Sequence, residues 1–313
     1  MPEAMIDVQN LTKDYGTYLA LREVSFEVQK GEIVGFLGPN GAGKTTTMRI
    51  LTGYLPPSSG TARVAGYDVF TDSLQVRKRI GYLPETVPLY PEMSVWDYLD
   101  FAARLRNVSD RDPAIERAME LTNIADHADT LIGRLSKGYR QRVGLAQAIV
   151  HEPEVLILDE PTIGLDPKQI IEVRHLIKSL AGEHTVLLST HILPEASQIC
   201  SRVLIINEGK IVAEDTPARL GARVRGAEHV FLQVAQPAPE IPTELEKIKG
   251  VLGVKAKDQA PGAYEIETNL GADRRADIAA LAVQRGWGVL ELRPVGLSLE
   301  EVFLKLTTTE EEQ

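Results

Sequence analysis

The sequence contains a single cysteine and lacks long apolar runs. Cys200 is the one cysteine among its 313 residues. No disulfide can therefore form within the chain, and no multi-cysteine metal site is available. The densest apolar runs, Val155 to Leu158 and Val203 to Ile206, are far shorter than the ~18 apolar residues of a membrane-spanning helix. We therefore expect a chain that does not itself cross a membrane.

The chain also lacks a run rich in Lys or Arg. Its N-terminus has no basic segment followed by an apolar segment. Lys and Arg total 34 against 44 Asp and Glu, which gives a formal charge of −10. This acidic balance argues against bulk attraction to nucleic acid, and we predict no nucleic-acid partner. Residues 1–9 disfavour a secretory signal. Together with the single cysteine, these features indicate a cytoplasmic protein.

Residues 1 to about 220 alternate β-rich runs with helical patterns, which is typical of an α/β domain around a largely parallel sheet. Short apolar runs, as expected for strands covered on both faces, lie at Ile33 to Leu37, Ile80 to Leu83, Val155 to Leu158, Val186 to Ser189 and Val203 to Ile206. More polar runs that predict an antiparallel β flank lie at Met5 to Asp14, Leu19 to Val28 and Thr61 to Val64.

Residues 94–150 lack strand runs and contain three helix starts. Ser94 begins a capping-box pattern, and Ser136 opens the last of the three helices. Between them, Asp112 and Pro113 would be an N-cap and a first helical residue. We therefore predict a helical subdomain over about 94–150, within a first domain of residues 1–220.

A composition shift near residues 221–226 indicates a second domain, residues 221–313. Its patterns follow the order strand, helix, strand, strand, helix, strand, which predicts a small α+β, ferredoxin-like fold. A terminal helix at 299–306 and an acidic tail at 307–313 complete the prediction.

One segment carries a phosphate-binding pattern between a predicted strand and a predicted helix. It matches G-x-x-x-x-G-K-[ST] and, with one further threonine, consists of Gly38, Pro39, Asn40, Gly41, Ala42, Gly43, Lys44, Thr45 and Thr46. Glycines let the backbone N–H groups face phosphate oxygens, and the helix N-terminus adds a positive dipole. Lys44 would reach the β- and γ-phosphates, and Thr45 would hold Mg²⁺. A plain glycine-rich turn is the alternative.

A predicted buried strand ends in two carboxylates, Asp159 and Glu160. Burial of such a pair without a cation is costly, so we expect a metal beside them. Asp159 would orient Mg²⁺ or its water, and Glu160 could polarise an attacking water. The alternative is a strand that ends at the surface with two solvated acids.

With these motifs in this order, residues 4 to 220 resemble the ATP-binding subunits of ABC transporters. Three further segments match the family's remaining motifs: Leu135 to Arg142 is similar to the signature, Gly164 to Asp166 to the D-loop, and Ser189 to His191 to the switch region. The resemblance implies a P-loop NTPase fold that binds ATP and Mg²⁺ and hydrolyses ATP.

The resemblance also implies roles for single residues. Ser136 and Gly138 would contact the nucleotide held by the opposite protomer, so the site would be composite and would require a homodimer. His191 would sense the γ-phosphate, and Tyr15 would stack on the adenine. Ser136 could instead be only an N-cap, His191 a structural histidine and Tyr15 a packing residue.

The sequence departs from the family pattern at three positions. Lys137 and Tyr139 replace a usual glycine and glutamine of the signature, and Glu85 stands where many relatives have glutamine. A carboxylate at position 85 can still ligate Mg²⁺, but it donates a hydrogen bond only when protonated. Leu89 to Pro91 could present apolar surface to a membrane protein's coupling helix, or could pack a turn.

By this resemblance, the chain would power a separate integral membrane permease through ATP-driven closure of a homodimer. It would lie on the inner face of the cell membrane as a peripheral cytoplasmic subunit. The sequence of Ile80 to Tyr90 and the second domain resemble the ABC-2 exporter or gliding-motility type. The alternative is a soluble ABC ATPase of translation or DNA repair, although such proteins commonly carry two cassettes or a long coiled coil.

Overall fold

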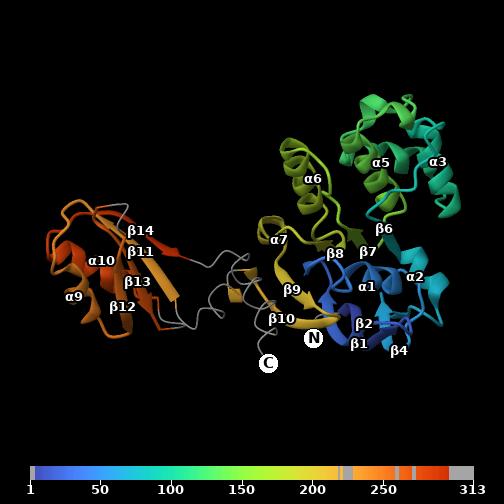
Figure 1. The fold of residues 1–313 in the computed structure, drawn as a ribbon. Helices are drawn as coiled ribbons and strands as arrows, with labels where there is room; N and C mark the ends of the chain where they lie inside the picture. Colours follow the sequence, from blue (N-terminus) through green and yellow to red (C-terminus); the bar gives the residue numbers. More distant parts are fainter. Residues whose placement is uncertain (1–3, 218, 221–227, 258–260, 270–272, 296–313) are drawn as a thin grey trace. The chain divides into compact units, whose positions relative to one another are not determined.

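The structure, a computed structural model, describes residues 4–217, 219–220, 228–257, 261–269 and 273–295 (Figure 1). The chain divides into two compact units, Met1–Thr216 and Pro217–Gln313. The helix predicted at 299–306 and the tail at 307–313 lie outside the described residues. None of the described helices has both the length and the apolarity that crossing a bilayer requires.

A six-stranded sheet forms the centre of the first unit, with strand order β10-β9-β3-β8-β7-β6. The strands from β9 to β6 are parallel, and β10 pairs antiparallel with β9 at one edge. The bounds are β3 Ile33–Leu37, β6 Ile80–Leu83, β7 Val155–Asp159, β8 Thr185–Thr190, β9 Arg202–Asn207 and β10 Lys210–Asp215. Every residue of β3 and β7 is buried, which confirms the strands predicted from these two apolar runs.

An antiparallel sheet, with strand order β2-β1-β4-β5, forms the predicted flank. One buried apolar cluster joins this sheet, the central sheet and helix α1, with Leu11, Phe36 and Met48 among its members. The bounds are β1 Ala4–Asp14, β2 Leu19–Gln29, α1 Lys44–Leu51, β4 Ser59–Val64, β5 Tyr67–Asp68 and α2 Ser73–Arg79.

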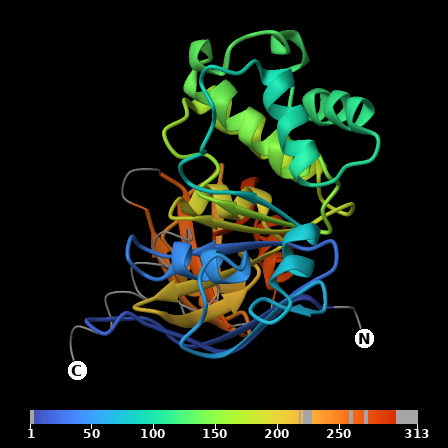
Figure 2. The same cartoon turned by 90° about the vertical axis from the view of Figure 1, so that its right-hand side faces the viewer.

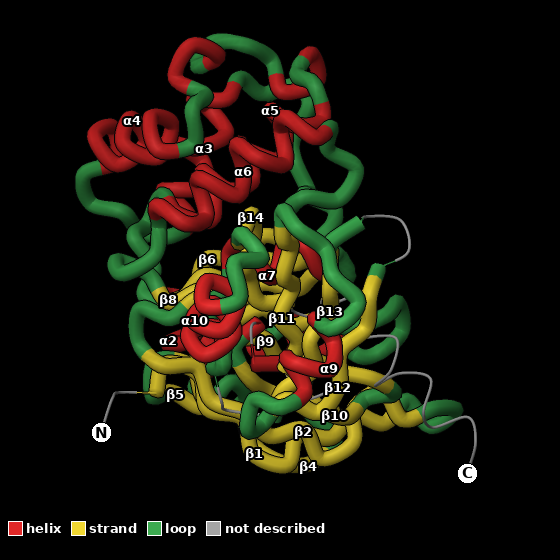
Figure 3. The backbone as a smooth tube through the Cα atoms, turned by 90° about the vertical axis from the view of Figure 1, so that its left-hand side faces the viewer, coloured by secondary structure: helices red, strands yellow, loops and turns green. Residues whose placement is uncertain are grey.

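A group of helices follows β6 and forms a layer of its own, in which α5 packs against β6 (Figures 2 and 3). It contains α3 Val95–Leu105, α4 Arg111–Leu121, the short 3-10 turns η1 Ala125–His127 and η2 Ile132–Arg134, and α5 Lys137–Ile149. The hydroxyls of Ser94 and Ser136 cap α3 and α5, as predicted.

The predicted start of α4 is wrong by two residues. The N-cap is Asp110 rather than Asp112, so Pro113 is the third helical residue rather than the first. Proline is tolerated there because the N–H groups of a helix's first turn have no intrahelical acceptor in any case.

Two helices follow strands that carry the site. After β7 comes α6 Pro167–Ser179, which begins with a complete capping box between Asp166 and Gln169. After β8 comes α7 Leu193–Ile199.

The second unit has the element order predicted from the sequence. Its bounds are β11 Glu228–Val234, α9 Ile241–Glu246, β12 Val251–Ala256, β13 Ala263–Thr268, α10 Arg275–Gln284 and β14 Val289–Val295. The antiparallel strand order β12-β13-β11-β14 places the first and third strands at the centre of the sheet. Alternate residues such as Val230, Leu232 and Ile266 point to a core that also contains Trp287.

Candidate functional site

The segment from Gly38 to Thr46 connects β3 to α1, as the sequence predicts. A Cβ on Gly38 would lie 2.4 Å from the carbonyl oxygen of Ile206, so only glycine lets the loop pass β9 this closely. Gly43 caps α1 with a φ of 109°, a backbone conformation that side chains other than glycine's rarely allow. The loop is therefore held tightly against the sheet at the N-terminus of a helix, where backbone N–H groups favour an anion.

Lys44 is the first residue of α1, and its side chain folds back over the loop. Its Nζ donates hydrogen bonds to the carbonyl oxygens of Gly38 and Pro39, at 2.7 and 3.1 Å. The same Nζ lies 3.5 Å from Oε1 of Glu160. The ammonium is only 6% exposed, so it is a buried cation held by groups that a phosphate could replace.

A cavity of about 450 Å³ opens in front of this loop. Its lining combines loop residues, acidic groups, a histidine and apolar side chains: Tyr18, Ala20, Asn40, Gly41, Gly43, Lys44, Thr45, Thr46, Glu85, Glu160, Ile163 and His191. This volume lies within the range of small-ligand sites. The structure thus brings together residues that the sequence analysis selected from four separate segments.

Asp159 ends β7 and is almost wholly buried, with 1% exposed. Its Oδ1 accepts a hydrogen bond from the hydroxyl of Ser189, whereas its buried Oδ2 has no partner among the described residues. Burial raises the pKa of this carboxyl, and the neighbouring hydroxyls of Ser189 and Thr45 offset that effect only in part. A buried carboxylate oxygen without a partner, next to a threonine hydroxyl, is a donor set that suits Mg²⁺. Asp159 is not itself among the lining residues of the cavity, whereas Thr45 and Glu85 are, and Glu85 could add a third oxygen.

Glu160 lies directly after β7 in a left-handed conformation with a φ of 49°. Its N–H donates to the hydroxyl of Ser189 at 3.0 Å, so the end of β8 holds this unusual backbone. Its carboxylate lies between two groups: Oε1 faces Lys44, and Oε2 is 2.9 Å from Nδ1 of His191. Strained residues of this kind concentrate at functional sites.

Ser136 and Gly138 do not line this cavity. Ser136 accepts the N–H of Tyr139 as the cap of α5, and the side chain of Gln169 fills the space beside Gly138. Lys137 extends over Gly164, where its Nζ occupies the place that a Cβ would need. The two predicted signature residues therefore lie together on one helix start, and a single chain does not bring them to Lys44.

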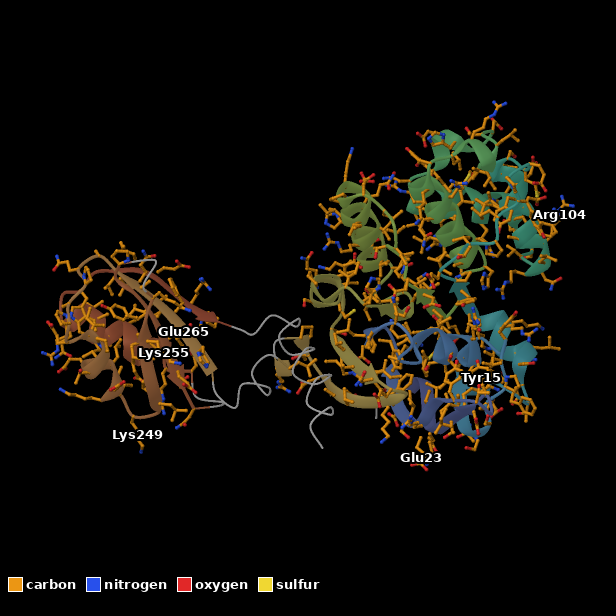
Figure 4. All side chains as sticks on the ribbon, viewed as in Figure 1. Tyr15, Glu23, Arg104, Lys249, Lys255 and Glu265 are labelled. Atoms are coloured by element: carbon orange, nitrogen blue, oxygen red, sulfur yellow. The ribbon has the colours of Figure 1, made fainter. Side chains whose placement is uncertain are left out.

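Tyr15 does not line the cavity either, but the neighbouring Tyr18 does. The two rings stack with centroids 5.3 Å apart, and Tyr15 is 43% exposed. Figure 4 labels Tyr15. The sequence analysis missed Tyr18, although a second aromatic residue three positions after Tyr15 was the available signal. It also missed Ile163 and Ala20, the apolar part of the lining.

The sequence matches the ABC transporter family over residues 21–163. The bacitracin transport ATP-binding protein BcrA of Bacillus licheniformis is 34% identical and aligns over 96% of this chain and 97% of its own length. A Nod factor export ATP-binding protein I, from Paraburkholderia xenovorans, is also 34% identical, over 99% of both chains.

Solved structures give the same result for the first unit's fold. A structure described as the ATP binding subunit of an ABC transporter is 30% identical, with a TM-score of 0.64, over 70% of this chain and 92% of that one. CbiO1 from Clostridium perfringens, part of the ABC transporter complex cbiONQ, is 28% identical, with a TM-score of 0.65, over 71% of this chain and 94% of its own.

Proposed function

This chain belongs to the family of ABC transporter ATP-binding proteins, and we propose that it hydrolyses Mg-ATP to drive a separate membrane permease. It is an ATP-binding cassette ATPase. The observation that carries the proposal is the series of contacts from buried Lys44 through buried Glu160 to the more exposed His191 in one cavity, beside the oxygen of Asp159 that has no partner among the described residues.

Lys44 binds the β- and γ-phosphates in this mechanism. Its present hydrogen bonds to the carbonyls of Gly38 and Pro39 keep the ammonium over the loop, where phosphate oxygens can replace them. The loop's N–H groups and the N-terminus of α1 favour the same charge. The site is therefore charged and oriented before the nucleotide arrives.

Thr45, Asp159 and Glu85 are the residues that would hold Mg²⁺. When bound, the cation would neutralise charge on the phosphate oxygens. Asp159 supplies the buried oxygen that has no other described partner, and Thr45 supplies a hydroxyl next to it.

Glu160 accepts a proton from the attacking water. Once Lys44 turns to the phosphates, Oε1 of Glu160 faces the cavity, and the contact with His191 continues to orient Oε2. His191 would meet the γ-phosphate; the support is that its side chain lines the cavity and is 40% exposed. Such general-base catalysis typically supplies ~10²–10⁴ in rate.

Ser136 and Gly138 act on the nucleotide of a second protomer. The support is that both residues lie at a capped helix start, where N–H groups suit a phosphate, and that neither lines the cavity of its own chain. ATP would then bridge two copies of the chain, and closure and reopening of this homodimer would be the mechanical output.

The membrane role rests on the relatives. BcrA and the Nod factor protein carry transport and export in their names, and they align over nearly the whole chain, second unit included. We infer an exporter of the ABC-2 type whose ATPase subunit lies peripherally on the cytoplasmic face of the membrane. The same full-length alignment disfavours a soluble ATPase of translation or DNA repair.

The direct test is phosphate release from Mg-ATP by the purified chain, with Lys44→Ala and, as a matched control, the exposed Lys78→Ala. We expect Lys44→Ala to abolish tight ATP binding and turnover and Lys78→Ala to change neither. Recovery of the chain from a detergent extract with a polytopic membrane protein tests the transport role. Turnover in Lys44→Ala would contradict the site, and co-purification with ribosomes would contradict the permease.

A further inference from the structure

Glu195 is a buried carboxylate that the proposed mechanism does not use. It lies on α7 with only 4% of its surface exposed, and its Oε1 has no partner among the described residues. Burial raises the pKa of this carboxyl, against the opposing effects of the Thr162 hydroxyl and the charge of Arg174. Burying an acidic group costs free energy unless hydrogen bonds or an opposite charge stabilise it, so the contacts of Glu195 decide how it is accommodated.

The other oxygen of Glu195 joins the loop after β7 to the last residue of β8. The hydroxyl of Thr162 donates to Oε2 at 2.6 Å, and the hydroxyl of Thr190 donates more weakly to the same oxygen at 3.5 Å. Thr190 in turn accepts the N–H of Ile192 at 2.9 Å, so its hydroxyl is fixed from both sides. Both threonines are buried, at 2% and 0% exposed.

These two threonines are neighbours of the reacting pair. Thr162 lies two residues after Glu160, and Thr190 comes directly before His191. Glu160 and His191 follow different strands, and their 2.9 Å contact depends on the relative position of the two loops. A displacement of about 1 Å between catalytic groups can cost 10²-fold in rate.

We propose that Glu195 is a positioning residue, which holds Glu160 and His191 in register by anchoring Thr162 and Thr190 to one carboxylate oxygen. The inference rests on the proposed ATPase mechanism, in which Glu160 is the base. Glu195 itself does not line the nucleotide cavity. Its effect should therefore appear in kcat and not in ATP affinity.

The experiment compares Glu195→Ala, Glu195→Gln, Thr162→Val and the double variant Thr162→Val with Glu195→Ala. Gln198→Ala, an exposed position on the same helix, is the matched control. For each full-length variant, phosphate release gives kcat and KM, calorimetry gives the ATP dissociation constant, and thermal melting reports folding.

We expect Glu195→Ala to lower kcat about tenfold or more, with ATP affinity within about twofold of the wild type. Glu195→Gln keeps an acceptor oxygen for Thr162 and should retain most of kcat. Thr162→Val should lower kcat, and the double variant should be no worse than Glu195→Ala, because both changes remove the same hydrogen bond.

Three results would overturn the proposal. They are a wild-type kcat in Glu195→Ala or Thr162→Val, additive losses in the double variant, or a Glu195→Gln enzyme as impaired as the alanine variant. If Glu195→Ala does not fold, Thr162→Val and Glu195→Gln still decide the question, because they nearly preserve side-chain volume. A wild-type chain without ATPase activity would instead reject the proposed function.

Discussion

The two units of this chain place their charged side chains differently. In the first unit, Lys44, Asp159, Glu160 and Glu195 are all buried at or near the ends of parallel strands. In the second, Thr268 is the only buried polar residue within the described ranges, and the charged groups form ion pairs at the surface. Among the described residues, the charged side chains that are almost wholly buried lie in the first unit, which indicates where binding and chemistry take place.

The largest expected effect concerns the pH dependence of folding stability, which in the first unit depends on His151. Its Nε2 donates to the carbonyl oxygen of Ile80 at 2.9 Å, its Nδ1 is buried, and burial lowers its pKa from 6.5 to about 4, with a contribution from the charge of Arg106. As the pH falls, the unfolded chain therefore binds a proton on His151 at a higher pH than the folded chain does. The folded state loses stability between about pH 6.5 and pH 4. The shift corresponds to about 3 kcal/mol at most.

Thermal melts of His151→Gln at pH 7 and pH 4.5 measure this difference, because glutamine can still donate to Ile80. We expect the unfolding transition of the first unit to shift less between pH 7 and pH 4.5 in His151→Gln than in the wild type. His175→Gln, an exposed position on α6, should behave as the wild type. Equal acid sensitivity in His151→Gln and the wild type would show that His151 is not the responsive group.

A much smaller effect is expected from an ion pair of the second unit. Glu265, labelled in Figure 4, contacts Lys257 at 2.6 Å and His229 at 2.9 Å, and these partners lower the pKa of its carboxyl. Because the side chain of Lys257 is 53% exposed and solvent screens its pair with Glu265, Glu265→Gln should cost less than about 1 kcal/mol. Urea unfolding at low and high salt measures the stability that Glu265→Gln loses. Glu267→Gln, on the same strand, is the control variant. A loss of several kcal/mol would mean that this unit also depends on charge.

Deleting residues 226–313 should leave ATP affinity unchanged. Every residue of the proposed nucleotide site lies before position 192, and the first unit has its own apolar core. Calorimetry on the shortened chain measures the dissociation constant, and we expect coupling to the permease to be the property that is lost. A folded product that does not bind ATP would contradict the separation of the two units.

Sequence patterns predicted the five parallel strands of the central sheet because each is a compact apolar run. Strand β10 was missed because it is polar and only partly buried. The glycine at position 209 was an available sequence signal for a hairpin turn. In the structure both Glu208 and Gly209 adopt positive φ values, as tight hairpin turns require. Local chemistry can therefore identify a strand that composition hides.

The candidate site was predicted unevenly for a physical reason. Lys44, Asp159 and Glu160 lie in short motifs whose chemistry is local, and their proximity follows from β3 and β7, two parallel strands that flank β8. The bond between Thr162 and Glu195 joins residues 33 positions apart, and it depends on how α7 packs. No local pattern encodes such a contact. The role of Ser136 depends on a second chain and stays a prediction.

The most direct test of the central claim is Glu160→Gln in the full-length chain. The amide keeps the side chain's shape but cannot accept a proton, whereas Lys44, Thr45 and Asp159 are unchanged. We predict wild-type ATP affinity, phosphate release lowered by ~10²–10⁴, and an ATP-dependent dimer that persists on size-exclusion chromatography with Mg-ATP. The exposed Glu152→Gln should show none of these changes. Near-normal turnover in Glu160→Gln, or a monomer that binds ATP tightly without dimerising, would contradict the account.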